Sequence, residues 1–62
     1  MNFNHYLGRI TISTLKRDPR VYDDCDWGFN DDGFLVILKE NKLQTMINID
    51  QIERIDFSPP RS

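Results

Sequence analysis

The chain has 62 residues, of which 29% are charged, and its formal net charge is −2. A chain this short forms a single domain whose core leaves only a few kcal/mol of net stability, so it needs a disulfide, a metal or a second subunit. Cys25 is the only cysteine and His5 the only histidine, which excludes an internal disulfide and leaves too few ligands for a structural zinc site. We therefore expect a homo-oligomer.

The sequence also indicates where the protein acts. A single thiol is typical of a reducing compartment, and no apolar run approaches the roughly 20 residues that are needed to cross a bilayer. The N-terminal residues lack the charged and apolar regions of a signal peptide. We expect a cytoplasmic protein that does not bind membranes.

The first half of the chain predicts two strands joined by a loop. Residues 9–13 alternate polar and apolar side chains and are rich in β-branched residues, so they suit a half-buried strand. The segment before them, which contains His5, is expected to be mobile. Residues 16–20 contain Pro19 and are expected to form a loop. The strand that follows is expected to turn one side to the core, namely Val21, Asp23, Cys25, Trp27 and Phe29.

The second half predicts three more strands. Residues 34–38 are apolar throughout and are expected to form the central strand, buried on both faces. Turns are expected at residues 30–33, where Gly33 can adopt a positive φ, and around Asn41. The next strand is expected to place alternate side chains on one face, namely Leu43, Thr45, Ile47 and Ile49.

The last residues predict a short helical turn and a final strand. Asp50 and Glu53 have the spacing of a capping box, which favours one turn of helix before residues 55–57 become extended. The sequence therefore predicts an all-β fold with five strands, either as a small, strongly bent antiparallel sheet or as an SH3-like or Sm-like barrel. Residues 1–57 would form this domain, and residues 58–62 a proline-containing tail.

The order of these elements resembles the small SH3-like and Sm-like barrels. The resemblance is closest to an Sm-like fold of the Hfq type and covers roughly residues 34–61. It implies a barrel that assembles into a ring. The nucleotide-binding signature of Hfq has no counterpart here, because residues 46–50 read Met-Ile-Asn-Ile-Asp, so no binding residue is transferred.

Candidate catalytic and metal-binding residues are few. His5 lies in the segment that is expected to be mobile, where a general base would be poorly held. Cys25 is expected to point inward, and the neighbouring Asp24 and Asp26 would raise the pKa of its thiol. No register of the acidic stretch at residues 23–32 places acids and glycine as a calcium-binding loop requires. We therefore expect no enzyme, no cofactor and no metal.

The acidic stretch carries aromatic residues and suggests a first function. It contains five acidic and no basic residues, and aromatic side chains are enriched at the centres of protein interfaces. Our first hypothesis is a non-enzymatic inhibitor, of the size typical of viral and mobile-element accessory factors, that docks on a basic surface of a host protein. The expected contact residues are Asp23, Asp24, Asp26, Trp27 and Phe29. Alternatively, Trp27 anchors the core and the carboxylates are simply solvated.

The loop before the second strand is basic and suggests an alternative function. Lys16, Arg17 and Arg20 lie close to Tyr22, and guanidinium groups and aromatic rings suit phosphates and bases. The alternative hypothesis is that these residues bind a nucleotide, a cyclic nucleotide or short RNA. Binding to duplex DNA is not expected, because three cations in an acidic chain release too few counterions. A solvated loop, or a purely structural subunit of a larger assembly, remains open as well.

Overall fold

The computed structural model describes residues 2–60, which form one five-stranded antiparallel sheet in the order β4-β3-β2-β1-β5. The elements are β1 (Asn4–Thr14), β2 (Arg20–Phe29), β3 (Phe34–Lys39), β4 (Lys42–Asn48), a 3-10 turn η1 (Ile49–Gln51) and β5 (Ile52–Ser58). This confirms the predicted all-β class with five antiparallel strands and one short helical turn. The sheet is not closed into a barrel, because β4 and β5 form its two edges.

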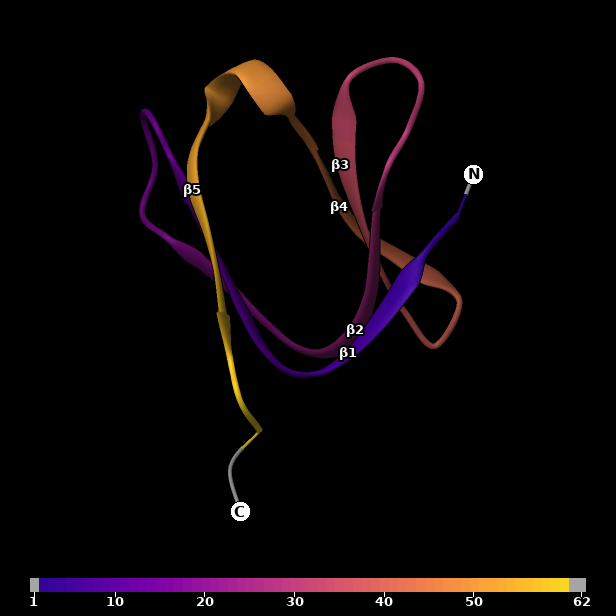
Figure 1. The fold of residues 1–62 in the computed structure, drawn as a ribbon. Coiled ribbons are helices and arrows are strands. Elements are labelled where there is room, and N and C mark those ends of the chain that lie inside the picture. The colour runs from indigo at the N-terminus through magenta and orange to yellow at the C-terminus, as the bar shows by residue number, and fades with distance from the viewer. Residues whose placement is uncertain (1, 61–62) are drawn as a thin grey trace.

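β1 and β2 form a long hairpin that bends in its middle. Figure 1 shows the pair as a U-shaped ribbon, with β3 and β4 lying against one arm and β5 against the other. The strand pairing agrees with this assignment of β3, β4 and β5 to the two arms. β5 pairs with residues 9–14 of β1, whereas β3 pairs with residues 26–29 of β2. Each outer strand therefore covers only one arm, and the bend brings the two arms face to face around the core.

The bend lies at a bulge between the two long strands. The pairing register shifts between Tyr6 and Arg9, and Asp24 on the opposite strand has a φ of 49°, a left-handed conformation that Asp tolerates better than most residues. Gly8 lies within the shifted segment. A β-carbon at Gly8 would collide with the carbonyl oxygen of Ser58 and with the Tyr6 ring. Glycine is therefore required where β5 crosses the bend.

The core is small and aliphatic on the concave side of the sheet. Its buried members are Ile10, Ile12, Cys25, Leu35, Ile37 and Ile47, with Tyr6, Tyr22, Trp27, Ile52 and Ile55 packed around them. The predicted inward position of Cys25 is thus confirmed. The prediction for the start of β2 was wrong, because Val21 and Asp23 are exposed and Tyr22 packs against the core. The left-handed residue Asp24 breaks the alternation, so Tyr22 and Cys25 face the same side although they are three positions apart.

Three further sequence predictions need correction. β4 ends at Asn48, so Ile49 lies in η1 and not in the strand with Leu43, Thr45 and Ile47 as predicted. β1 begins at Asn4 rather than at residue 9, so His5 lies in a paired strand and not in a mobile segment. β3 is buried on both faces as predicted, but the central strand of the sheet is β2. β1 continues across the bend and pairs with both β2 and β5. The sheet therefore has two strands on each side of β2, namely β3 and β4 on one side and β1 and β5 on the other.

The backbone conformations of the turns match those expected from their residue types. Gly33 has a φ of 84° and Asn41 a φ of 65°, as predicted, and Glu40 shares the left-handed conformation. The prediction of a capping box formed by Asp50 and Glu53 was wrong. The residue that caps η1 is Asn48, whose side chain accepts a hydrogen bond from the Asp50 amide. Asn30 supports the other turn by accepting a hydrogen bond from the Phe34 amide at 2.9 Å.

At the C-terminal end, β5 includes Ser58, whose carbonyl oxygen accepts a hydrogen bond from the Tyr6 hydroxyl at 2.9 Å. Pro59 and Pro60 follow without regular structure, and the rest of the predicted tail, residues 61–62, lies outside the described residues. Within residues 2–60 the one helical element is the three-residue η1, and no helix has the length and apolar character needed to cross a membrane.

Replacing Gly8 by alanine should loosen β5 from β1. The new methyl group has to push aside a backbone carbonyl, and we expect a loss of about 2 kcal/mol in the free energy of unfolding. Gly33→Ala is the matched control, because nothing lies within 4 Å of its position and only its positive φ is penalised. Amide hydrogen exchange should accelerate along β5 in Gly8→Ala and not in the control. Equal protection of β5 in both variants would contradict this role of Gly8.

A candidate anion-binding pocket at the tip of the β1–β2 hairpin

A cavity of about 720 Å³ lies where the tip of the β1–β2 hairpin faces β4 and η1. Its lining residues are Thr14, Leu15, Lys16, Arg17, Arg20, Phe34, Met46, Ile47, Asn48 and Gln51. The three predicted phosphate-binding cations, Lys16, Arg17 and Arg20, thus share one pocket. Tyr22, the fourth predicted residue, packs against the core and does not line this cavity.

The pocket is held together by contacts between segments far apart in sequence. The Leu15 amide donates a hydrogen bond to the Gln51 carbonyl oxygen at 3.0 Å, which fastens the hairpin tip to η1. The Arg20 guanidinium donates to the Thr45 hydroxyl at 3.0 Å in a partly buried setting, which links β2 to β4. β2 and β4 are not neighbours in the sheet, so this bond spans the open side of the fold.

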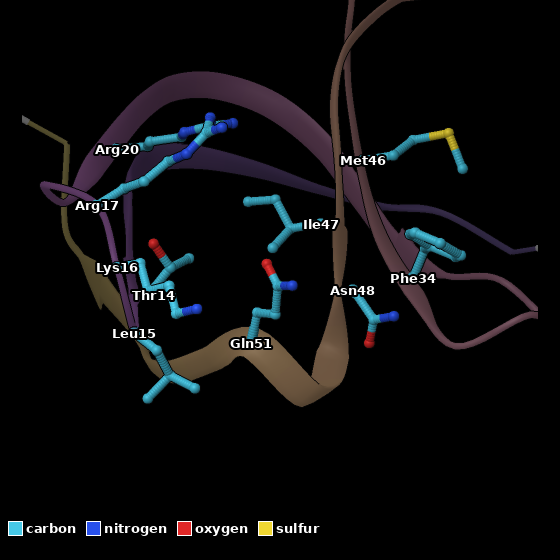
Figure 2. A pocket seen from close by; sticks show the side chains of 10 residues that line it. All are labelled: Thr14, Leu15, Lys16, Arg17, Arg20, Phe34, Met46, Ile47, Asn48 and Gln51. Carbon is cyan, nitrogen blue, oxygen red and sulfur yellow. The ribbon is translucent and has the colours of Figure 1, made fainter.

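The cations of the pocket are not neutralised within the described residues. Every ion pair among residues 2–60 lies elsewhere, and none involves Lys16, Arg17 or Arg20. Figure 2 shows Arg17 and Arg20 side by side, with Ile47 and Gln51 facing them across the opening. Three cations without an ion pair around one cavity make this part of the surface electropositive, and a surface of that sign steers anions toward it.

Two of the apolar lining residues lie apart from the arginines. Met46 and Phe34 are on the other side of β4 from the two arginines in Figure 2. The alternation along β4 explains this, since Ile47 is buried in the core whereas Met46 is 46% exposed. An anion held by the arginines would therefore meet Ile47 and Gln51 first, and Met46 only beyond the edge of β4.

One polar group in the pocket wall has no partner. The Thr14 hydroxyl oxygen is buried and makes no hydrogen bond within the described residues. Leaving a buried polar group unsatisfied costs about 1–3 kcal/mol. Sequence reasoning missed Thr14, although it lies two residues before Lys16, because nothing in the sequence marks its hydroxyl as buried. It missed Thr45 and Gln51 because β4 and η1 reach the basic loop only after the sheet has bent.

The predicted acidic and aromatic residues do not lie together on one surface. Asp24 and Asp26 both bond to His5, and Asp23 pairs with Arg9 at 3.2 Å. The aromatic members point to the opposite side of β2. Trp27 packs on the core and contacts Phe29 and Phe57 at centroid distances of 5.9 Å and 5.2 Å. Only Phe29 among the two predicted aromatic residues is strongly exposed, at 47%.

His5 is held between two carboxylates at the bend. Its Nδ1 lies 2.6 Å from Asp26 Oδ1 and its Nε2 lies 2.9 Å from Asp24 Oδ1. The hydrogen bond to Asp26, supported by the one to Asp24, raises the pKa of His5 above its ordinary value of 6.5. No three His, Cys, Asp or Glu side chains within residues 2–60 are placed to hold a metal ion. We therefore interpret the His5 cluster, formed by His5, Asp24 and Asp26, as two ion pairs that stabilise the pairing of β1 with β2.

Cys25 is unsuited to nucleophilic chemistry. Its side chain is buried, and burial raises the pKa of the thiol, with Asp26 and Asp24 adding to the effect. This agrees with the direction that the neighbouring aspartates predicted. A thiol of raised pKa that is shielded from solvent is a weak nucleophile at neutral pH.

Comparisons with known proteins find no match, whether to a protein-family model, to a curated protein or to a solved structure. The function is therefore argued from the geometry of the pocket and from the surfaces around it.

The His5 cluster should make the stability of the fold depend on pH. Because the pKa of folded His5 lies above 6.5, its contribution is complete below that value and is lost as the pH rises through the raised pKa. We expect the melting temperature of the protein to fall over this range, and that of His5→Gln to change less. An NMR titration of the His5 ring should give a midpoint above 6.5. A midpoint at or below 6.5 would refute the proposed stabilisation by the His5 cluster.

Proposed function

We propose that this protein is a non-enzymatic binding protein of the cytoplasm that holds a small phosphorylated ligand, such as a nucleotide or cyclic nucleotide, in its basic pocket. The observation that carries the proposal is the gathering of Lys16, Arg17 and Arg20, unpaired within the described residues, around a cavity of about 720 Å³. Small-molecule sites typically have volumes of about 300–1,000 Å³.

The chemistry of the lining suits a phosphate group. Guanidinium groups match phosphate oxygens in a planar, bidentate geometry, and the pocket offers two of them beside an ammonium group. Beyond the edge of β4, Met46 and Phe34 supply an apolar surface on which a base or another apolar part of the ligand could rest. Three cations on an acidic chain favour a ligand with one or a few phosphates over a long nucleic acid.

The proposal includes a homo-oligomer. β4 and β5 are both edge strands, and their outer backbone groups have no partner strand within residues 2–60. Apolar side chains accompany the β4 edge: Leu43 is 57% and Met46 is 46% exposed, and Ile49 follows at 41%. An exposed edge with apolar side chains is a ready template for pairing with a second copy, which would supply the stability that the small core lacks.

A second candidate function is docking on a host protein as an inhibitor. The observation that favours it is Phe29, which is 47% exposed at the end of β2, close to the acidic turn at residues 30–33. Asp23, Asp24 and Asp26 lie on the other side of β2, so this candidate would use two neighbouring surfaces around one strand. It predicts no response to any phosphorylated small molecule, which distinguishes it from the first candidate.

Binding should be visible by calorimetry with adenosine monophosphate, a cyclic dinucleotide and inorganic pyrophosphate. Replacing Arg17 or Arg20 by glutamine removes charge-assisted hydrogen bonds, so we expect the Kd of the ligand that binds to rise about tenfold or more. Arg54→Gln is the matched control, because Arg54 is exposed on β5 and pairs with Asp56 outside the pocket.

The two outcomes are clearly separated. Loss of affinity in the pocket variants, with the control unchanged, supports the proposed site. If the unaltered protein binds none of these compounds, or if Arg54→Gln weakens binding as much as the pocket variants do, the site is wrong.

The oligomer should be detected by light scattering as a mass above the 7.4 kDa of one chain. Leu43→Lys with Met46→Lys places two charges along the β4 edge, and we expect the mass to fall to that of the monomer. Val21→Lys, an exposed apolar residue on the central strand, is the control and should leave the mass unchanged. A monomeric mass for the unaltered protein at high micromolar concentration would end this part of the proposal.

A further inference from the structure

The hydrogen bond between Arg20 and Thr45 has a consequence for binding. Arg20 belongs to β2 and Thr45 to β4, and their side chains meet at 3.0 Å across the open side of the sheet. Arg20 is paired on its strand with Ile12, and Thr45 with Ile37, both of which are core residues. Both ends of the bond are therefore anchored to the rigid part of the molecule.

The three cations of the pocket differ in how they are held. The Arg20 side chain donates a hydrogen bond to Thr45. The side chains of Lys16 and Arg17 make no hydrogen bond within the described residues. Lys16 and Arg17 also lie in the turn between the strands and are exposed, whereas Arg20 is half-buried. Arg20 is thus the fixed cation of the pocket.

A fixed arginine favours binding for an entropic reason. A free arginine side chain loses much of its rotamer freedom when it grips an anion, and a side chain that is already held loses less. The bond to Thr45 uses one N–H of the guanidinium group, and its other N–H donors remain for a ligand. Thr45 does not line the cavity, so it acts on the ligand through Arg20 and not by direct contact.

We infer that Thr45 is a positioning residue: it holds the Arg20 guanidinium in place before the anion arrives and thereby raises the affinity of the pocket. The effect on affinity rests on the proposed function, whereas the positioning of Arg20 can be observed without any ligand. The acceptor is the hydroxyl group, so serine should replace threonine and the isosteric valine should not.

The test uses Thr45→Val and Thr45→Ser in the full chain. Without ligand, nitrogen-15 NMR of the Arg20 Nε–H group should show a rigid side chain in the unaltered protein and in Thr45→Ser, and a mobile one in Thr45→Val. Thr11→Val makes the same chemical change on β1 away from the pocket and should leave Arg20 rigid. If Arg20 is equally rigid in Thr45→Val, or already mobile in the unaltered protein, the inference is overturned.

Affinity for the phosphorylated compound that binds gives the second measurement. We expect the Kd to rise about threefold to tenfold in Thr45→Val and to change less than twofold in Thr45→Ser and Thr11→Val. An unchanged Kd in Thr45→Val, with Arg20 mobilised, overturns the claim that positioning matters for affinity. If the unaltered protein binds none of the compounds, the proposed function and this effect on affinity both fail, and the NMR result alone decides whether Thr45 holds Arg20.

Discussion

The fold depends on one constraint, the bend of the β1–β2 hairpin at Gly8 and Asp24. Two straight strands of this length would make a flat ribbon that buries little apolar surface. The bulge turns the ribbon on itself, so that β5 on one arm and β3 with β4 on the other enclose a single core. Gly8 leaves room for β5 to pass, and His5 ties the two strands together beside the bulge through Asp24 and Asp26.

The pocket follows from the same bend, because the sheet curls without closing. Individual hydrogen bonds, and not a strand ladder, join the hairpin tip to η1 (Leu15 to Gln51) and the start of β2 to β4 (Arg20 to Thr45). The cations therefore border an opening that a continuous ladder would have filled. Charge is also uneven along the hairpin: Lys16, Arg17 and Arg20 outnumber Asp18 at its tip, whereas Asp23, Asp24 and Asp26 outnumber Arg9 at the bend. Of the two, the tip is the part of the hairpin with the net positive charge that favours an anion.

The sequence predicted the features that local chemistry determines. The apolar run of β3, the left-handed turn residues Gly33 and Asn41, and the clustering of the loop cations all follow from neighbouring residues. Gly8 marks a place in the sequence where a bulge or sharp bend is tolerated, but nothing in the sequence marks the left-handed conformation of Asp24 on the opposite strand. The residues predicted to face the core were therefore one position out of register at Val21 and Asp23, before Asp24. Thr45 was missed for another reason, since only the bent sheet brings β4 to Arg20.

The pairing of β1 with β5 also constrains how the chain folds during synthesis. Arg9 lies opposite Ser58, so β1 has its second neighbour only after β2, β3, β4 and β5 have all been made. Until then β1 and β2 form a hairpin with one side of β1 uncovered, and such long-range pairing slows folding. We expect the complete sheet, and with it the buried core, to form only after β5 has paired with β1, and slow pairing of these two strands would prolong the exposure of the apolar strands to aggregation.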